Sequence, residues 1–220
     1  MKFSAAILGF ALLAQSVSGH YIFNELIAGS KTSTKAVRQP QSNSPVHDYL
    51  SNDIRCNIDP STASETVSVA AGSKIGFNLG ENKKIYHLGP VDIYLGKAPG
   101  KAQDWDGSGK NWFKIAEWGA TFNPFSFKSL DKSRFTTTIP KDTPSGEYLV
   151  RIEQIGLHLT GTPEFFISCA QIKVTNGGDG NPAKVSIPGV YKKTDPSLNV
   201  DIYWPIPTSY DVPGPEVWRG

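Results

Sequence analysis

The sequence predicts an all-β protein, an immunoglobulin- or fibronectin-like antiparallel β-sandwich with long loops. Short runs that are rich in β-branched and aromatic residues recur between turn clusters, which is typical of strands in such sandwiches. Glycine and proline contribute 21 and 16 of the 220 residues, and this favours many turns over long helices. The length fits a single domain with one core.

Seven segments have the composition of strands, and several of them alternate apolar and polar residues. In chain order they are 66–70, 74–78, 91–95, 112–117, 134–139, 147–155 and 165–174. The turn at 141–147 leads into the sixth segment, a pattern that is common in immunoglobulin-like sandwiches.

Two long stretches, 29–53 and 177–220, do not have the pattern of strands. Loops of this length in a compact domain are usually functional surfaces or disordered ends. The second stretch is too apolar for a free tail, so we expect it to pack along the sandwich. Its large apolar residues are Ile202, Tyr203, Trp204, Ile206, Tyr210 and Trp218.

The first 19 residues have the pattern of a secretory signal peptide. Lys2 supplies a positive charge, residues 5–14 are almost unbroken apolar sequence, and small residues precede His20. The apolar run is too short to span a bilayer, and no later segment is apolar enough to do so. We therefore expect a secreted, extracellular protein with one domain at 20–220 that starts at His20. The alternative is cleavage a residue or two away, with His20 an ordinary surface histidine.

The net charge limits the possible binding partners of the protein, and the two cysteines indicate a disulfide. The formal net charge of +2 argues against nucleic acid or an anionic membrane as the main partner, and we expect a monomer. The two cysteines, Cys56 and Cys169, are expected to form a disulfide in an oxidising compartment, although a reactive thiol pair is an alternative.

A histidine at the start of the mature chain is an unusual ligand, because its free α-amine and its Nδ1 can chelate one metal ion. Of the other three histidines, His87 lies in a rigid loop before Gly89-Pro90, and we expect His47 to be solvated surface. Two imidazoles and one amine suit Cu(II), which prefers tetragonal nitrogen ligation. The absence of an H-E-x-x-H motif argues against a zinc hydrolase. Taken alone, His87 is more often a structural histidine than a ligand, and His158 is more often a core or rim residue.

Further motifs follow in order along the chain. They are His20-Tyr21, Tyr86-His87-Leu88-Gly89-Pro90, Trp112-Phe113-Lys114-Ile115, Ser145-Gly146-Glu147-Tyr148-Leu149, Arg151-Ile152-Glu153-Gln154-Ile155-Gly156-Leu157-His158, Phe166-Ile167-Ser168-Cys169-Ala170-Gln171, Pro207-Thr208-Ser209-Tyr210 and Pro213-Gly214-Pro215. Together they resemble fungal lytic polysaccharide monooxygenases of the cellulose-active auxiliary activity family 9.

This resemblance implies a β-sandwich with a flat substrate face and one type-2 copper. The copper ligands would be the His20 amine, the His20 Nδ1 and an imidazole nitrogen of His87, and Cys56 would pair with Cys169. The implied activity is oxidative cleavage of cellulose or a related β-1,4-glucan at C1 and/or C4, with an external electron donor.

The resemblance also assigns residues around the copper and on the flat face. His158 would steer the oxygen chemistry from beside the ligands, and Tyr210 would stack on sugar rings. Tyr21 and Tyr49 are further candidates for the substrate surface, with core packing as the alternative for each.

Two positions depart from the family pattern. Phe166 stands where a tyrosine usually lies in the axial direction of the copper, so no phenolic oxygen is present there. Glu164 replaces a neutral amide by an acid, which changes the pairing with His158. These changes define an alternative, a secreted copper-binding relative with lost or altered catalysis. A sugar-binding sandwich without metal is a third hypothesis.

Overall fold

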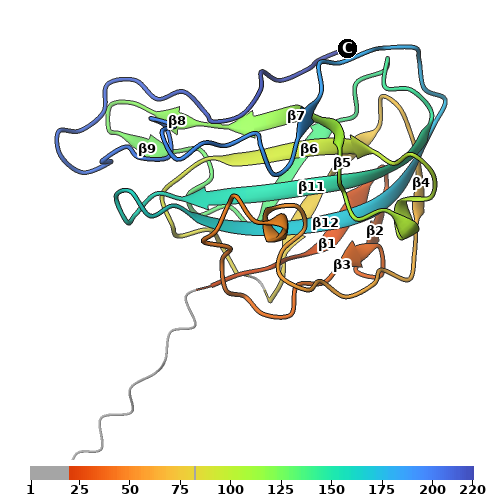
Figure 1. Cartoon of the computed structure of the whole chain (residues 1–220), viewed down its shortest axis with the longest axis horizontal. Helices are drawn as coiled ribbons and strands as arrows, with labels where there is room; N and C mark the ends of the chain where they lie inside the picture. The colour runs from red at the N-terminus through yellow and green to blue at the C-terminus, as the bar shows by residue number, and fades with distance from the viewer. Residues whose placement is uncertain (1–19, 82) are drawn as a thin grey trace, which may run out of the picture.

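Two β-sheets packed face to face form the body of the protein in a computed structural model, which describes residues 20–81 and 83–220 (Figure 1). The smaller sheet has the strand order β10-β5-β1-β2 and is antiparallel throughout. Its strands are β1 (Phe23–Ala28), β2 (Lys31–Ser33), β5 (Lys74–Leu79) and β10 (Arg134–Thr138).

The larger sheet has the strand order β13-β7-β6-β11-β12-β3, and β4 (Val67–Ala70) pairs with β12 in parallel. A separate two-stranded ribbon joins β8 and β9, and two short 3-10 helices, η1 and η2, lie in loops. The remaining bounds are β3 (Val37–Arg38), η1 (Asn52–Ile54), β6 (Val91–Lys97), η2 (Ala102–Asp104), β7 (Lys110–Trp118), β8 (Ala120–Thr121), β9 (Ser126–Phe127), β11 (Gly146–Gly156), β12 (Glu164–Thr175) and β13 (Val185–Ser186).

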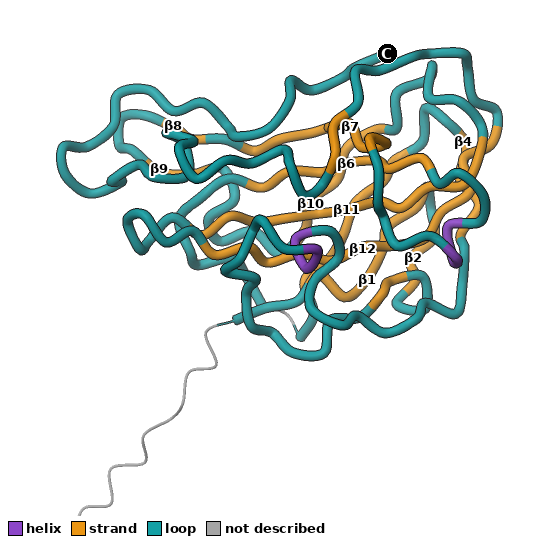
Figure 2. Tube along the Cα trace, in the orientation of Figure 1, coloured by secondary structure: helices purple, strands orange, loops and turns teal. Residues whose placement is uncertain are grey.

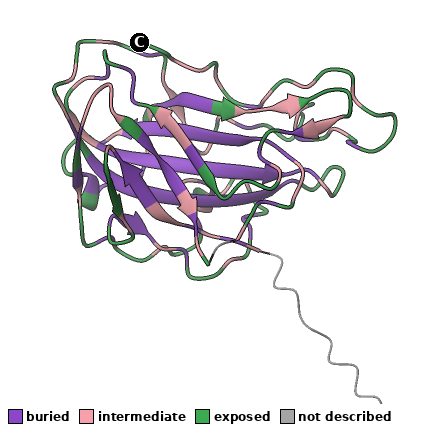
Figure 3. Cartoon of the chain, turned by 180° about the vertical axis from the view of Figure 1, so that it is seen from behind, coloured by how far each residue is buried: buried purple, intermediate pink, exposed green. Residues whose placement is uncertain are grey.

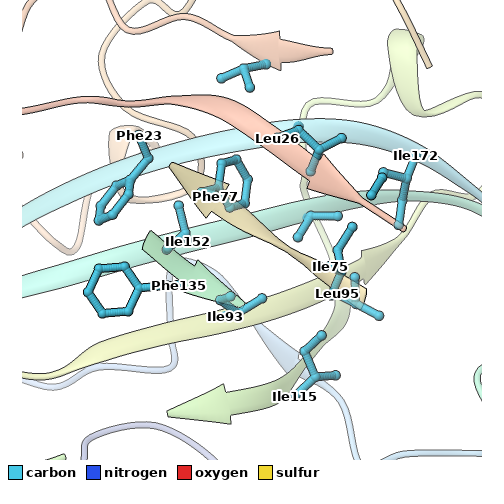
Figure 4. Packing of buried hydrophobic residues seen from close by; sticks show 14 of the residues in the cluster. Phe23, Leu26, Ile75, Phe77, Ile93, Leu95, Ile115, Phe135, Ile152 and Ile172 are labelled. Atoms are coloured by element: carbon cyan, nitrogen blue, oxygen red, sulfur yellow. The ribbon is translucent and has the colours of Figure 1, made fainter. Parts of the chain in front are cut away.

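The main core lies between the two sheets, and Figure 3 shows that the central strands are buried along most of their length. Alternate side chains of each sheet point into this layer, as the two-residue period of a strand requires. Figure 4 shows Phe23, Leu26, Ile75, Phe77 and Phe135 from the smaller sheet facing Ile93, Leu95, Ile115, Ile152 and Ile172 from the larger one.

All seven predicted strand segments form strands, so the predicted β-sandwich is confirmed. The stretches 29–53 and 177–220 were expected to hold no strand, and that expectation is wrong at β2, β3 and β13. All three are very short, which is why their composition gave no signal. The longer strand β1 was not predicted either. The parallel pairing of β4 with β12 also departs from a purely antiparallel sandwich.

The C-terminal stretch packs on the sandwich only in part. Ile202 is buried and Trp218 is half-buried against the core, as expected. Tyr203, Trp204 and Ile206 are 54%, 80% and 60% exposed, so the expectation that they pack is wrong. Figure 2 shows this stretch as loop over much of its length, and loops also gather at the end of the sandwich where β8 and β9 lie.

A disulfide joins Cys56 to Cys169, with 5.2 Å between the two Cα atoms, and confirms the predicted pairing. It ties the segment after η1 to the middle of β12. The predicted signal peptide at 1–19 lies outside the described residues. Within the described part of the chain, no helix is long and apolar enough to cross a membrane.

Candidate metal centre

The end of the β11–β12 hairpin carries two of the predicted site residues. Glu164 and Phe166 are two residues apart on β12, so their side chains leave the same face of the sheet. On β11 their partners in register are Gly156 and Gln154. Because Gly156 has no side chain, the space beside Glu164 stays open to His87 and His158; a Cβ there would lie 3.3 Å from the His158 Nδ1.

His87 lies in the loop before β6, and the backbone behind it approaches β11 closely. Gly89 has a φ of +150°, and a Cβ at this position would lie 1.7 Å from the carbonyl oxygen of Ile155. Only glycine fits such an approach. The Ser129 hydroxyl donates a hydrogen bond of 2.6 Å to the Gly89 carbonyl, which further fixes the loop.

His20 lies immediately before β1 and next to His87 and Phe166. Its ring centroid is 6.1 Å from that of His87 and 5.6 Å from that of Phe166. The amide of Asn43 and the ammonium group of Lys83 donate hydrogen bonds of 3.4 and 3.1 Å to the His20 carbonyl oxygen. The predicted ligands His20 and His87 therefore come together, with Phe166 packed against both.

His158 and Glu164 complete the group. The His87 and His158 rings stack at 4.0 Å with an interplanar angle of 13°. The Glu164 Oε2 lies 3.6 Å from the His158 Nε2 and 4.0 Å from the His87 Nε2. One ligand atom each from His20, His87 and Glu164 lie within 4.8 Å of one another.

In the part of the chain that the structure describes, three polar atoms of this group are buried without a hydrogen-bond partner: His87 Nε2, His158 Nδ1 and Glu164 Oε2. Buried polar atoms in native proteins almost always have partners, and an ion or water is one explanation of an exception. Unpartnered buried atoms also occur elsewhere, such as both carboxylate oxygens of Asp92, but here three of them gather beside His20. Burial is the main cause that lowers the pKa of His87 to about 4, with further contributions from His158 and His20. His87 is therefore neutral near pH 7, the protonation state in which an imidazole binds a metal.

Tyr21, a candidate for the substrate surface, is buried, so that assignment is wrong and its alternative, core packing, is correct. Its ring packs 4.7 Å from that of Phe166, and its hydroxyl donates a 2.6 Å hydrogen bond to the Gln154 Oε1. The Gln154 Nε2 in turn donates to the His87 carbonyl at 3.3 Å. Gln154 thus connects the segment that follows His20 to the loop that carries His87.

The other predicted residues lie apart from this group. Tyr210 is half-buried, packs edge-on against Phe127 at 5.2 Å and donates to the Ser197 carbonyl. Tyr49 packs against Phe165 at 5.4 Å. His47 is exposed, in keeping with its assignment as surface.

Sequence reasoning missed Gln154, Asn43 and Lys83, which hold the two histidine segments in place. Gln154 lies within one of the quoted motifs, but a motif does not show which backbone carbonyl or hydroxyl distant in the chain a side chain will contact. It also missed the exposure of Tyr203 and Trp204, since a sequence rich in large apolar residues ordinarily predicts burial.

Comparison with known proteins identifies the kind of site. Residues 20–210 match the sequence profile of Auxiliary Activity family 9 (formerly GH61). The chain belongs to this family. It is 47% identical to AA9 family lytic polysaccharide monooxygenase H of Malbranchea cinnamomea, over 96% of this chain and 97% of that protein. It is 46% identical to monooxygenase C of Emericella nidulans, over 96% of each chain.

A solved structure agrees with this family membership. A cellulose-active polysaccharide monooxygenase from M. thermophila superposes with a TM-score of 0.79 at 28% identity, and the match covers 91% of this chain and all of that one. Family 9 members are copper-dependent oxidoreductases that act on polysaccharides with an external reductant, and the fungal members are secreted. This chain is accordingly a copper-dependent polysaccharide monooxygenase.

Proposed function

We propose that the mature enzyme begins at His20 and holds one copper ion through the His20 α-amine, the His20 Nδ1 and an imidazole nitrogen of His87. We further propose that this centre cleaves cellulose or a related β-1,4-glucan oxidatively at C1 and/or C4. The observation that carries the proposal is the convergence of His20 and His87 beside buried polar atoms that have no hydrogen-bond partner among residues 20–81 and 83–220.

The donor set fits copper. Two imidazoles and an amine are nitrogen ligands of the type that Cu(II) prefers, and each binds as the neutral base, so an α-amine that is protonated releases its proton on binding. The copper, when bound, supplies the one-electron redox chemistry. His87 is held neutral by burial, and the carbonyl of His20 is fixed by Asn43 and Lys83, so both ligand segments are oriented before the metal arrives.

The chain's own residues would keep the centre apolar on one side and polar on the other. Phe166 covers the two histidine rings and excludes water from that direction. His158, stacked on His87 and 25% exposed, can hold or donate a proton from Nε2 at the edge of the site. An oxidative reaction needs a proton source of this kind close to the metal.

For the substrate, exposed aromatic side chains offer a surface that suits sugar rings. Tyr203 and Trp204 project from the C-terminal stretch. Large aromatic side chains that gather on an exposed surface often mark a contact site. Cellulose is the glucan named for the M. thermophila relative, and a flat array of glucan chains matches an exposed aromatic surface better than a deep pocket would.

The ligand assignment predicts that chain extension and ligand removal abolish tight copper binding. An extra residue ahead of His20 converts the amine into an amide and removes a ligand, and His87→Ala removes another. Residues that only support ligands cost about 10–100-fold in metal affinity when mutated, so we expect each of these changes to cost at least about 100-fold. Calorimetric titration with Cu(II) measures the loss.

The exposed His47 provides the matched control, because His47→Ala also deletes an imidazole but leaves the group of histidines intact. Its affinity should equal that of the wild type. Tight binding by the extended protein would contradict the assignment of the amine.

The activity is tested by mass spectrometry of soluble products from swollen cellulose, with and without a reductant. Oxidised oligosaccharides that appear only with copper and reductant are the expected result. The alternative is a copper-binding relative with lost or altered catalysis, and the presence of Phe166 and Glu164 beside the histidines favours it. Tight copper binding without oxidised products from any β-1,4-glucan would establish that alternative.

A further inference from the structure

We propose that Glu164 is itself a copper ligand, so that the centre combines the His20 amine, two imidazoles and one carboxylate. This inference rests on the proposed copper site of His20 and His87 and adds a ligand to it.

The distances fit a shared ion. Imidazole nitrogens and carboxylate oxygens bind a comparable divalent metal, zinc, at about 2.0–2.2 Å, so two donors on one ion lie at most about 4 Å apart. The Glu164 Oε2 is 4.0 Å from the His87 Nε2, and the ligand atoms of His20, His87 and Glu164 all lie within 4.8 Å of one another. Opposite donors on one ion lie about 4 Å apart and neighbouring donors about 3 Å apart, so shifts of about 1–2 Å, which rotation of side chains can supply, would bring all three onto one ion.

Without a metal, one oxygen of the Glu164 carboxylate, Oε2, has no hydrogen-bond partner among the described residues. The residue is 7% exposed, and its Oε2 accepts no hydrogen bond. Its ion-pair contacts among the described residues are to His87 and His158, and the shorter of them, at 3.6 Å, is beyond hydrogen-bond length. Burial of an uncompensated carboxylate is costly, and a bound cation removes that cost.

Phe166 strengthens the argument because it points from the same face of β12 and offers only hydrocarbon to the metal. The Glu164 carboxylate, two residues before Phe166 on the same face of β12, is an oxygen donor on this side of the centre. An anionic ligand also lowers the net charge of the occupied centre, which favours Cu(II) over Cu(I). The reduction potential and the Cu(II) spectrum therefore both report on the contact.

The experiment compares copper-loaded wild type, Glu164→Gln and Glu164→Asp, each with a native N-terminus. Three quantities are measured: the Cu(II) EPR parameters, the Cu(II) and Cu(I) affinities by competition, and the crystallographic distance from copper to Glu164 in the wild type. Asp48→Asn is the matched control. This substitution removes the charge of an exposed acid two residues after Val46. The backbone of Val46 pairs with that of Phe165, the residue after Glu164.

We expect a wild-type copper–oxygen distance near 2.0–2.2 Å. Glu164→Gln should change the EPR spectrum and weaken Cu(II) binding at least about tenfold more than Cu(I) binding, a ratio that corresponds to about 59 mV in potential. Glu164→Asp keeps the charge but withdraws the carboxylate by one methylene, so it should also lose the wild-type spectrum. Asp48→Asn should change none of these.

Two results would overturn the inference while the proposed function stands. One is a copper-loaded, active wild type in which the carboxylate lies more than about 3 Å from the metal. The other is Glu164→Asp with wild-type spectrum and potential, which would show that the charge acts through space. A wild type that binds no copper at all would overturn the proposed function and this inference together.

Discussion

Two groups of polar side chains, one fully buried and one half-buried, differ in where their positive charge comes from. The first, here called the closed cluster, consists of Asp92, Lys114, Arg151, Glu153 and Tyr191. Arg151 donates to the Ile54 and Arg55 carbonyls and to Glu153. Tyr191 also donates to Glu153, and Lys114 lies 3.5 Å from Asp92. Each acid in this cluster faces a base of the same chain.

The second group is the site of His20, His87, His158 and Glu164. It contains a buried carboxylate and buried imidazole nitrogens but no lysine or arginine that pairs with them among the described residues. Lys83 reaches this end, yet it donates to the His20 carbonyl and pairs with Glu81. The comparison teaches that the chain supplies its own cations in the closed cluster and supplies none at the group where we propose that copper binds.

The largest expected effect concerns the disulfide, which holds the closed cluster together. Cys56 follows Arg55, whose carbonyl accepts from Arg151, and Cys169 lies on β12. The bond spans a sequence separation of 113 residues, so its reduction is expected to cost about 4–5 kcal/mol in the chain-entropy model. Urea unfolding of oxidised and reduced protein measures the difference. A loss below 1 kcal/mol would show that the cluster holds this segment without the bond.

The next effect separates the two groups directly. Arg151→Met leaves Glu153 buried without its base, and such a loss costs about 3–5 kcal/mol. Copper affinity should stay at the wild-type value, because the histidine group contains no atom of Arg151. Unfolding in urea and copper titration of the same sample test both halves.

Arg134 is exposed on β10, so Arg134→Met gives the matched control and should change stability by less than about 0.5 kcal/mol. If Arg151→Met weakened copper binding as much as it weakened folding, the two groups would be one coupled network and the comparison would fail.

The sequence predicted the closed cluster far less well than the sandwich around it. Alternation along strands such as β11 identifies which residues face a core, and strand-like composition located seven strands, although it missed β1. It cannot show that Arg151 and Lys114 are fully buried, because charged residues are normally exposed and their burial depends on partners distant in the chain. Pro213 and Ile54, whose carbonyls accept from these two residues, are such partners.

The histidine site was more predictable, because the rarity of histidine and the position of His20 after a signal-like segment restrict the choice. His87, His158, Glu164 and Phe166 were all placed near the metal by resemblance, and the structure brings them together with His20. Tyr21 was misplaced, because a ring beside a site residue gives no sign of whether it faces solvent or core. Only the fold shows that its hydroxyl reaches Gln154.

The smallest effect concerns the boundary between the two groups. Glu153 and Gln154 are neighbours on β11, so their side chains point to opposite faces, Glu153 to the closed cluster and Gln154 to the histidine site. Gln154→Leu leaves the Tyr21 hydroxyl and the His87 carbonyl without their partner, at an expected cost of about 1–3 kcal/mol in stability. It should also weaken copper binding about tenfold, because the two ligand segments lose their link.

Gln171→Leu is the matched control for this change. Gln171 is an equally buried glutamine, on β12, and it bonds to Arg38 and to the Glu65 carbonyl, neither of which belongs to the histidine site. It should lose similar stability and keep wild-type copper affinity and EPR parameters. The difference between the two variants therefore isolates positioning from folding. Equal copper affinity in both variants would show that Gln154 serves the core alone, and that the histidine site is held by the contacts of Asn43 and Lys83 to His20.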